Sequence, residues 1–167
     1  MHFPRRSGLL MHPTSLPGRF GIGDWGSAAK RFVDFLAQAG QSYWQMLPLG
    51  PPGYGASPYQ SLSAFAGSPL LISPEKLVEA GHLSAADLAS TPAFPVERVD
   101  FEAVGPYKEA LLRRAFENFR ADAPDEQREA FARFCAKQAF WLDDFALFVA
   151  LKRVHGGRPW YEWPPEV

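Results

Sequence analysis

The first fifty residues carry a pattern of apolar and polar positions that predicts a strand, a helix and a second strand. Residues 8–11 form a short apolar run, which is typical of a buried strand in a parallel sheet. Over residues 27–39 the apolar side chains fall on one helical face, and Gly40 provides a C-terminal stop. A second short apolar run, residues 43–47, ends at Pro48. This order predicts one βαβ unit with parallel strands.

The segment that follows, residues 48–69, is rich in proline and glycine, which exclude a persistent helix or strand. Its tyrosines, Tyr54 and Tyr59, and its other apolar side chains give it surface to bury, so we expect an ordered loop. The loop leaves the C-terminal end of the second predicted strand, where ligand sites gather in parallel α/β sheets. No charged residue occurs from 35 to 74. The sequence therefore predicts a binding loop for a neutral ligand rather than for a phosphate or a nucleic acid.

The rest of the chain is predicted to be mainly helical. In order, the pattern predicts a brief extended piece at 70–72, a capped helix at 74–80, one further turn within 83–89 and an irregular segment at 91–100. Apolar residues then recur at helical spacing from Tyr107 to Phe119, and Pro124 begins another helix. Residues 139–154 are apolar on nearly all sides, which predicts neighbours around them, and the helix is expected to end at His155.

Composition indicates a globular protein and excludes several classes of partner. The 167 residues include 17 basic and 18 acidic side chains, so no basic field favours nucleic acid or anionic lipid. Cys135 is the only cysteine, which excludes an internal disulfide, fits a reducing compartment and predicts a buried structural thiol. No apolar run is long enough for a signal peptide or a membrane span. We expect a cytoplasmic protein with no membrane and no nucleic-acid partner.

Two motifs suggest cofactor chemistry but lack its context. Gly21, Gly23 and Gly26 match the dinucleotide-binding glycine pattern before a helix, yet about ten residues separate them from the first predicted strand. No acidic residue lies at the ribose-binding distance downstream, so no cofactor is expected, and Asp24 is predicted to cap or flank the helix start. The four histidines lack metal-ligand spacing, so no metal site is expected.

Five other side chains leave alternatives open. His12, at the end of the first predicted strand, either lines a site or is a satisfied structural histidine, and the structural interpretation is favoured. Asp143 and Asp144 point about 100° apart on a helix, which favours a solvated face or an ion pair over a shared proton. Trp160 and Trp163 could stack on a sugar, although packing is favoured.

Tyr59 has the best chemistry for a binding role. It lies between Pro58 and Gln60, with Ser57 nearby, and so offers an aromatic face beside hydroxyl and amide groups. Neutral polyols require this mixture of contacts. Simple packing of the loop remains an equal alternative.

A family resemblance rests on the segments GLLMHPTSLPG, FGIGDWG, YWQMLPLGPPGYGASPYQSLSAFAGSPLLI and ALFVALKRVHGGRPW. These segments closely resemble the amylomaltases, the 4-alpha-glucanotransferases of a glycoside hydrolase family related to the alpha-amylases. The resemblance covers essentially the whole chain. It implies an α/β fold, a (β/α)8 barrel with inserted subdomains, and retaining transfer of an α-1,4-glucan segment to the 4-hydroxyl of an acceptor glucan or glucose.

The resemblance also implies roles for particular residues. Tyr59 matches the tyrosine that lines the donor sugar subsite beside the scissile bond, with Ser57 and Gln60 next to it. Tyr54 matches an aromatic residue suited to a secondary glucan-binding surface. Phe101 is assigned to the same surface, although it lacks a hydroxyl.

The catalytic groups are expected elsewhere. Retaining transfer needs two carboxylates about 5 to 5.5 Å apart, and in the family these lie on strands beyond residue 167, so no catalytic residue is expected in this chain. A closed barrel also needs roughly 200 residues or more. We therefore expect the first βα units at 1–72, an inserted mainly helical subdomain at 73–158 and a connection back to the barrel at 159–167. The expected partners are an α-1,4-glucan or maltooligosaccharide and the remainder of the barrel; the alternative is a non-catalytic glucan-binding or assembly fragment.

Overall fold

The computed structural model describes residues 4–165, which divide between a first compact unit that ends at Ala123 and a second that begins at Pro124. The first unit contains, in order, β1 (Gly8–Leu10), η1 (Pro13–Ser15), α1 (Ser27–Gln38), β2 (Tyr43–Gln45), η2 (Tyr54–Ala56), η3 (Pro69–Leu71), α2 (Pro74–Glu79), η4 (Ala86–Leu88) and α3 (Phe101–Asp122), where η marks a short 3₁₀ turn. The second unit contains α4 (Asp125–Val154) and η5 (Trp160–Glu162).

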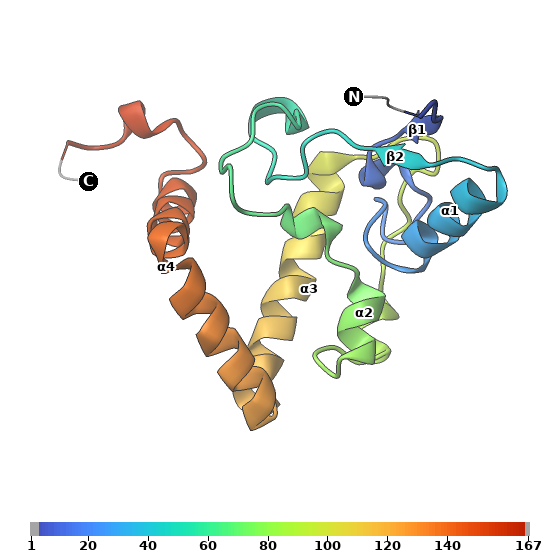
Figure 1. Ribbon diagram of the computed structural model, residues 1–167. Helices are drawn as coiled ribbons and strands as arrows, with labels where there is room; N and C mark the ends of the chain where they lie inside the picture. The colour runs from blue at the N-terminus through green and yellow to red at the C-terminus, as the bar shows by residue number, and fades with distance from the viewer. Residues whose placement is uncertain (1–3, 166–167) are drawn as a thin grey trace. The chain divides into compact units, whose positions relative to one another are not determined.

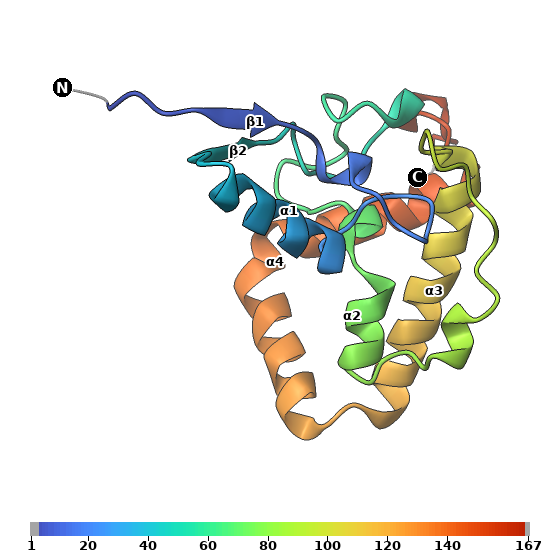
Figure 2. The same cartoon turned by 90° about the vertical axis from the view of Figure 1, so that its right-hand side faces the viewer.

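Strands β1 and β2 form a two-stranded parallel sheet with α1 beside it (Figures 1 and 2). Gly8 pairs with Tyr43, and a β-carbon at Gly8 would lie 2.5 Å from the Tyr43 carbonyl oxygen, so the pairing requires glycine. The ring of Phe32 on α1 packs edge-on against Trp44 of β2, with ring centroids 4.8 Å apart. The predicted strand, helix and strand are therefore confirmed, and so is the parallel pairing.

The prediction that the first strand is buried is wrong. All of β1 is exposed, and Leu10 keeps 59% of its surface accessible. Within residues 4–165 the sheet has only two strands, so neither a further strand nor a second layer covers the rest of its surface. An apolar run of this kind is typical of a buried strand. Within the described part of the first unit, no element buries the side chains of β1.

Helix α1 follows its predicted amphipathic pattern. It buries Ala29 and Leu36, while its outer face is exposed. Gly40 adopts a left-handed conformation, with φ of +68°, and the Gln41 N–H donates to the Leu36 carbonyl at 2.9 Å. This arrangement satisfies carbonyls at the helix end, and it confirms the predicted stop at Gly40.

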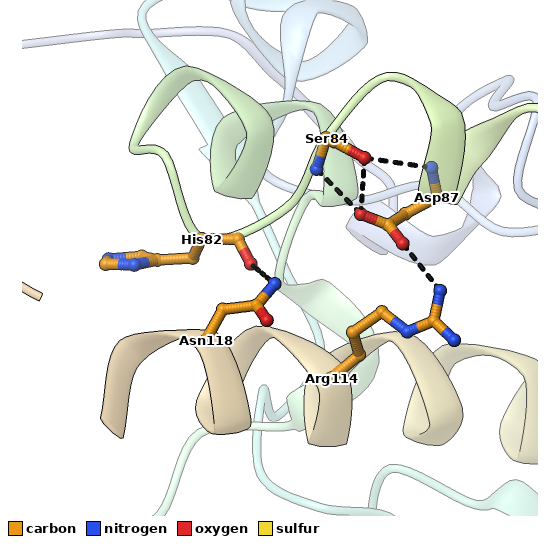
Figure 3. Close-up of polar contacts among 5 residues, drawn as sticks. All are labelled: His82, Ser84, Asp87, Arg114 and Asn118. Carbon is orange, nitrogen blue, oxygen red and sulfur yellow. Dashed lines mark hydrogen bonds and ion pairs between the residues drawn. The ribbon is translucent and has the colours of Figure 1, made fainter. Parts of the chain in front are cut away.

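The core of the first unit lies between α3 and the segment that contains α2 and η4, which run beside α3 (Figures 1 and 2). Its buried side chains are Phe20, Leu83, Leu88, Leu111 and Ala115, with Leu77, Val78 and Tyr107 packed against them. Polar contacts on the same side join the residues around η4 to α3 (Figure 3). The predicted helices, the turn within 83–89 and the irregular segment 91–100 are confirmed.

Two details of this region differ from the sequence-based expectation. Residues 70–72 were expected to be extended, but Pro69 begins a 3₁₀ turn, in which the Ile72 N–H donates to the Pro69 carbonyl at 3.1 Å. Proline presets the backbone for such a turn. Ser73 occupies the N-cap position of α2, as predicted, yet its side chain makes no capping hydrogen bond.

A buried ion pair joins α3 to the glycine-rich segment before α1. Lys108 is fully buried, and its Nζ donates to Asp24 Oδ2 at 3.3 Å and to the Ile72 carbonyl at 2.6 Å. Burial lowers the pKa of Lys108, and the Asp24 carboxylate acts in the opposite direction. The other Asp24 oxygen accepts the Gly26 N–H at 2.8 Å, so Asp24 flanks the start of α1, where Gly26 is the N-cap residue.

The second unit is dominated by one continuous helix. Pro124 is its N-cap residue, and Gly156, with φ of +63°, follows its end, so both predicted boundaries are confirmed. No residue of α4 is buried, and Phe140 keeps 70% of its surface accessible. Within the described part of its own unit, α4 has no element that buries it, and the neighbours that the apolar pattern of 139–154 predicts stay a prediction.

Several side chains of this unit settle alternatives left open by the sequence. Asp143 and Asp144 are exposed, which favours the solvated face. Cys135 is half-buried rather than fully buried. Trp163 stacks on His155 with ring centroids 5.2 Å apart, which confirms packing for this residue.

Candidate functional site

Residues 48–69 leave β2 as an irregular loop whose base is tied to the end of β1. His12 donates from Nε2 to the Pro48 carbonyl at 3.3 Å, and its Nδ1 contacts Thr14 Oγ1 at 2.7 Å. The Ser68 N–H donates to the Leu49 carbonyl at 2.8 Å and closes the neck of the loop. These bonds place the loop at the carboxyl ends of both parallel strands, as predicted (Figure 1). They also give His12 the structural role that the sequence favoured.

Serine side chains order the interior of the loop. Ser61 Oγ donates to the Ser63 carbonyl at 2.8 Å, and Ser63 Oγ accepts the N–H groups of Phe65 and Ala66 at 3.1 and 3.0 Å. An antiparallel bridge between Pro52 and Ser61 brings the two sides of the loop together. The loop is thus an ordered structure with no regular element longer than the three-residue turn η2.

Tyr59 lines a hollow of about 490 Å³ on this loop, called here the Tyr59 hollow. Its ring is 73% exposed, so packing does not hide it. The other lining residues are Pro48, Leu49, Gly50, Pro58, Ser61, Ser63, Ala64, Phe65, Ala66 and Gly67. The lining contains no charged side chain, which fits a neutral ligand. Ser57 and Gln60 are neighbours of Tyr59 in the chain but do not line the hollow.

A second hollow of about 610 Å³, the Phe101 hollow, lies between the η2 turn and the start of α3. Phe101 is half-buried and lines it, together with Gly53 and Gly55 on the turn. Tyr54 lies between these two glycines and is 92% exposed. The fold therefore brings the turn that carries Tyr54 close to Phe101, although Tyr54 itself does not line the hollow.

A small hollow of about 150 Å³, the His12 hollow, connects the other two through shared lining residues. It shares Pro48, Gly50 and Pro58 with the Tyr59 hollow, and Pro52, Ala56, Leu70 and Phe101 with the Phe101 hollow. His12, Thr14, Leu47 and Ser68 complete its lining. The sequence analysis missed Thr14 and Leu70, and the only signal for Thr14 was its position just after the first strand.

The chemistry of these hollows suits binding better than catalysis by this chain's own groups. No carboxylate lines the Tyr59 hollow or the His12 hollow. Asp100 and Glu102 line the Phe101 hollow. Asp100 Oδ1 accepts the Ala103 N–H at 3.1 Å and caps α3, and Glu102 lies in the first turn of that helix and is exposed. Residues 4–165 contain no cluster of three or more His, Cys, Asp or Glu side chains that could hold a metal ion. The same residues contain no helix that is long and apolar enough to cross a membrane.

The sequence model of the 4-alpha-glucanotransferase family matches residues 11–167. The chain belongs to this family. The 4-alpha-glucanotransferase of Thermus thermophilus is 52% identical over 164 residues, which are 98% of this chain and 32% of that protein. The Synechocystis 4-alpha-glucanotransferase is 48% identical over 163 residues, again 98% of this chain and 32% of that protein.

A solved structure agrees with this assignment. Amylomaltase from Streptococcus agalactiae in complex with acarbose matches with a TM-score of 0.88 and 38% identity, over 96% of this chain and 32% of that one. The resemblance stated from the sequence motifs is therefore confirmed. The chain spans about a third of the length of the curated relatives it matches.

Proposed function

We propose that this chain supplies the first two βα units of a (β/α)8-barrel 4-alpha-glucanotransferase. The enzyme would transfer an α-1,4-glucan segment from one 4-hydroxyl to another, with retention of configuration. The family match supports the reaction class. The observation that carries the site is the uncharged Tyr59 hollow at the carboxyl ends of β1 and β2, because barrel enzymes bind substrate at this face.

Within this enzyme, Tyr59 would stack on the donor sugar and direct its hydroxyl toward the reacting centre. Its exposed ring and neutral surroundings support the role. Ser57 and Gln60 would contribute hydrogen bonds from the adjacent turn, in which the Gln60 N–H donates to the Ser57 carbonyl at 3.2 Å. Tyr54 and Phe101 would form a secondary glucan-binding surface; the Phe101 hollow, which is lined by Phe101 and by the glycines on either side of Tyr54, supports this role.

The chemical step would need groups from outside these residues. Retaining transfer uses a nucleophilic carboxylate and an acid/base carboxylate about 5 to 5.5 Å apart, and the Tyr59 hollow contains neither. This chain would bind and orient the donor sugar, which lowers the entropic part of the barrier. The remainder of the barrel would then be the partner that covers β1 and β2. Three points stay predictions from the sequence. They are the division into 1–72, 73–158 and 159–167, the cytoplasmic location, and a role on glycogen or maltodextrin.

A chimera tests this function directly. Residues 1–167 would be joined to the remaining two-thirds of the Thermus thermophilus relative, and glucose release from maltotriose would be measured for the chimera and for the 167-residue chain. We expect activity in the chimera and none above a buffer blank in the chain alone. Glucose release by the chain alone, or a folded chimera without activity, would contradict the proposal.

A second candidate function is glucan binding without turnover. It is favoured by the Phe101 hollow, which is formed entirely within the first unit. The 167-residue chain could bind maltooligosaccharides under either function, so a folded chimera that remains inactive is the result that would favour this one.

A further inference from the structure

A fourth hollow, of about 360 Å³, lies in the first unit between residues 14–22 and 94–99, and is called here the Arg19 hollow. Phe94 lines this hollow, and its ring packs against Tyr107 with centroids 5.4 Å apart. A β-carbon at Gly21 would lie 2.4 Å from Phe94 Cγ, so glycine allows this close approach. Ile22 lines the same hollow and is almost completely buried. The hollow therefore has apolar walls held in place by packing.

Polar groups surround these apolar walls. The Arg19 guanidinium is fixed, because its Nη2 donates to the Leu88 carbonyl at 2.9 Å and it lies over the Phe20 ring at 5.1 Å. Ser15, Glu97 and Arg98 also line the hollow and are exposed. An aromatic wall with hydroxyl, donor and acceptor groups around it is the mixture that binds sugars. The carboxylate of Glu97 among the two arginines makes the hollow less suited to an anion.

The Arg19 hollow lies next to the hollows described above. It shares Arg98 and Val99 with the Phe101 hollow, and that hollow connects through the His12 hollow to Tyr59. Adjacent hollows that share lining residues fit a ligand long enough to cross from one to the next, such as a glucan chain. We propose that a glucan bound at the Phe101 hollow continues into the Arg19 hollow, which binds its further glucose units. This inference rests on the proposed function, and it adds a chain-length preference that the family assignment does not contain.

The test compares a short and a long maltooligosaccharide on the 167-residue chain. Maltotriose and maltoheptaose would be titrated by calorimetry into the wild-type chain and into Ser15→Trp, in which the indole occupies the Arg19 hollow. Ser90→Trp is the matched control, because Ser90 is also exposed but lines none of the described hollows. Glu97→Ala is a second variant, which removes an exposed acceptor without adding bulk. Circular dichroism would check that each variant is folded.

We expect the wild-type chain and Ser90→Trp to bind maltoheptaose about fivefold more tightly than maltotriose, the size of one added aromatic contact. Ser15→Trp should bind the two sugars with equal affinity. The preference of Glu97→Ala for maltoheptaose should lie between that of the wild-type chain and that of Ser15→Trp. Equal chain-length preference in all four proteins would overturn the inference, as would wild-type binding that does not depend on chain length. Displacement of maltoheptaose by inorganic phosphate would also overturn it, because the hollow would then be an anion site. Each of these results leaves the activity of the chimera, and hence the proposed function, unaffected.

Discussion

Tyr59 is 73% exposed and lines a hollow without charged groups, so its side chain contributes little to packing in the described structure. In the chimera, Tyr59→Ala should therefore lower the transfer rate while leaving the thermal midpoint nearly unchanged. Tyr59→Phe keeps the aromatic face but removes the hydroxyl. If this hydroxyl bonds near the reacting centre, the loss should be ~1 to 3 kcal/mol, or about 5- to 150-fold in kcat/KM.

The measurement is disproportionation kinetics together with thermal unfolding for both variants. Wild-type turnover in Tyr59→Phe, combined with a large drop in the midpoint of Tyr59→Ala, would assign Tyr59 to loop packing instead.

Lys108 and Asp24 provide the second prediction at the residue scale. Lys108→Met leaves the Asp24 carboxylate without its cation and the Ile72 carbonyl without its donor. Removal of one partner of a buried pair costs about 3 to 5 kcal/mol. Urea unfolding of Lys108→Met, Asp24→Asn and the double variant would measure the coupling. The double variant should be destabilised by clearly less than the sum of the single variants, and additive losses would show that the pair is not coupled.

The burial and pairing of Lys108 could not be predicted from the sequence. A lysine on an amphipathic helix is normally assigned to the solvated face, and nothing near Lys108 in the sequence indicates a buried position. Its partner lies in a distant glycine-rich segment, and the pairing exists only after α3 packs against that segment. The binding role of Tyr59 stays a prediction, but it could be proposed from the sequence because it depends on the immediate neighbours, Pro58 and Gln60, rather than on a remote partner.

At the scale of elements, one carboxylate adds polar contacts between α3 and the turn around η4 to the apolar packing there (Figure 3). Asp87 Oδ2 accepts the hydroxyl and the backbone N–H of Ser84, at 2.7 and 2.8 Å, and Arg114 donates to Asp87 Oδ1 at 2.6 Å. Nearby, the Asn118 side chain donates to the His82 carbonyl at 2.9 Å. The hydrogen bonds from Ser84 and the contact with Arg114 lower the pKa of Asp87 from 3.8 to about 2.

The sign of this shift gives a pH prediction. Because the folded state favours the ionised carboxylate, Asp87 contributes stability fully above pH 4, and loses it as the pH falls from about 4 to about 2. Asp87→Asn should therefore lower the thermal midpoint at pH 7, and its difference from wild type should shrink below pH 4. Asp143→Asn, at an exposed position of α4, is the control and should change little. A difference that stays constant from pH 7 to pH 3 would contradict the prediction.

The elements themselves were largely predictable, because their boundaries are set locally. Glycine at position 40 and proline at position 124 mark helix ends that the structure reproduces within one residue. The turn at 69–71 was missed because its apolar residues also fit a strand, and the proline that decides between the two lies just before them. Burial was less predictable than secondary structure. The apolar runs of β1 and α4 were recognised, but β1 is exposed in the first unit, and the residues that cover α4 stay unassigned.

At the scale of the molecule, the first unit has a sheet of two short strands, which is marginal without further strands or a covering layer. Both outer edges of this sheet are unpaired within residues 4–165, and Leu10 and Tyr43 expose most of their surface there. Phe35 adds a further exposed apolar side chain on the neighbouring helix. Unpaired edges with apolar side chains favour association between copies. We therefore expect the 167-residue chain to associate as its concentration rises, and the chimera, in which the remainder of the barrel covers these strands, to stay monomeric.

Light scattering of the chain and the chimera over a range of concentrations tests this prediction. Leu10→Lys places a charge on the exposed strand and should reduce association of the 167-residue chain. Val96→Lys is the matched control, because Val96 is fully exposed but lies outside the sheet. Both variants add the same charge. A difference in association between them would therefore come from the position of the charge on the strand. A monomeric wild-type chain at high concentration, or equal relief by both variants, would mean that the exposed edge of the sheet does not drive association.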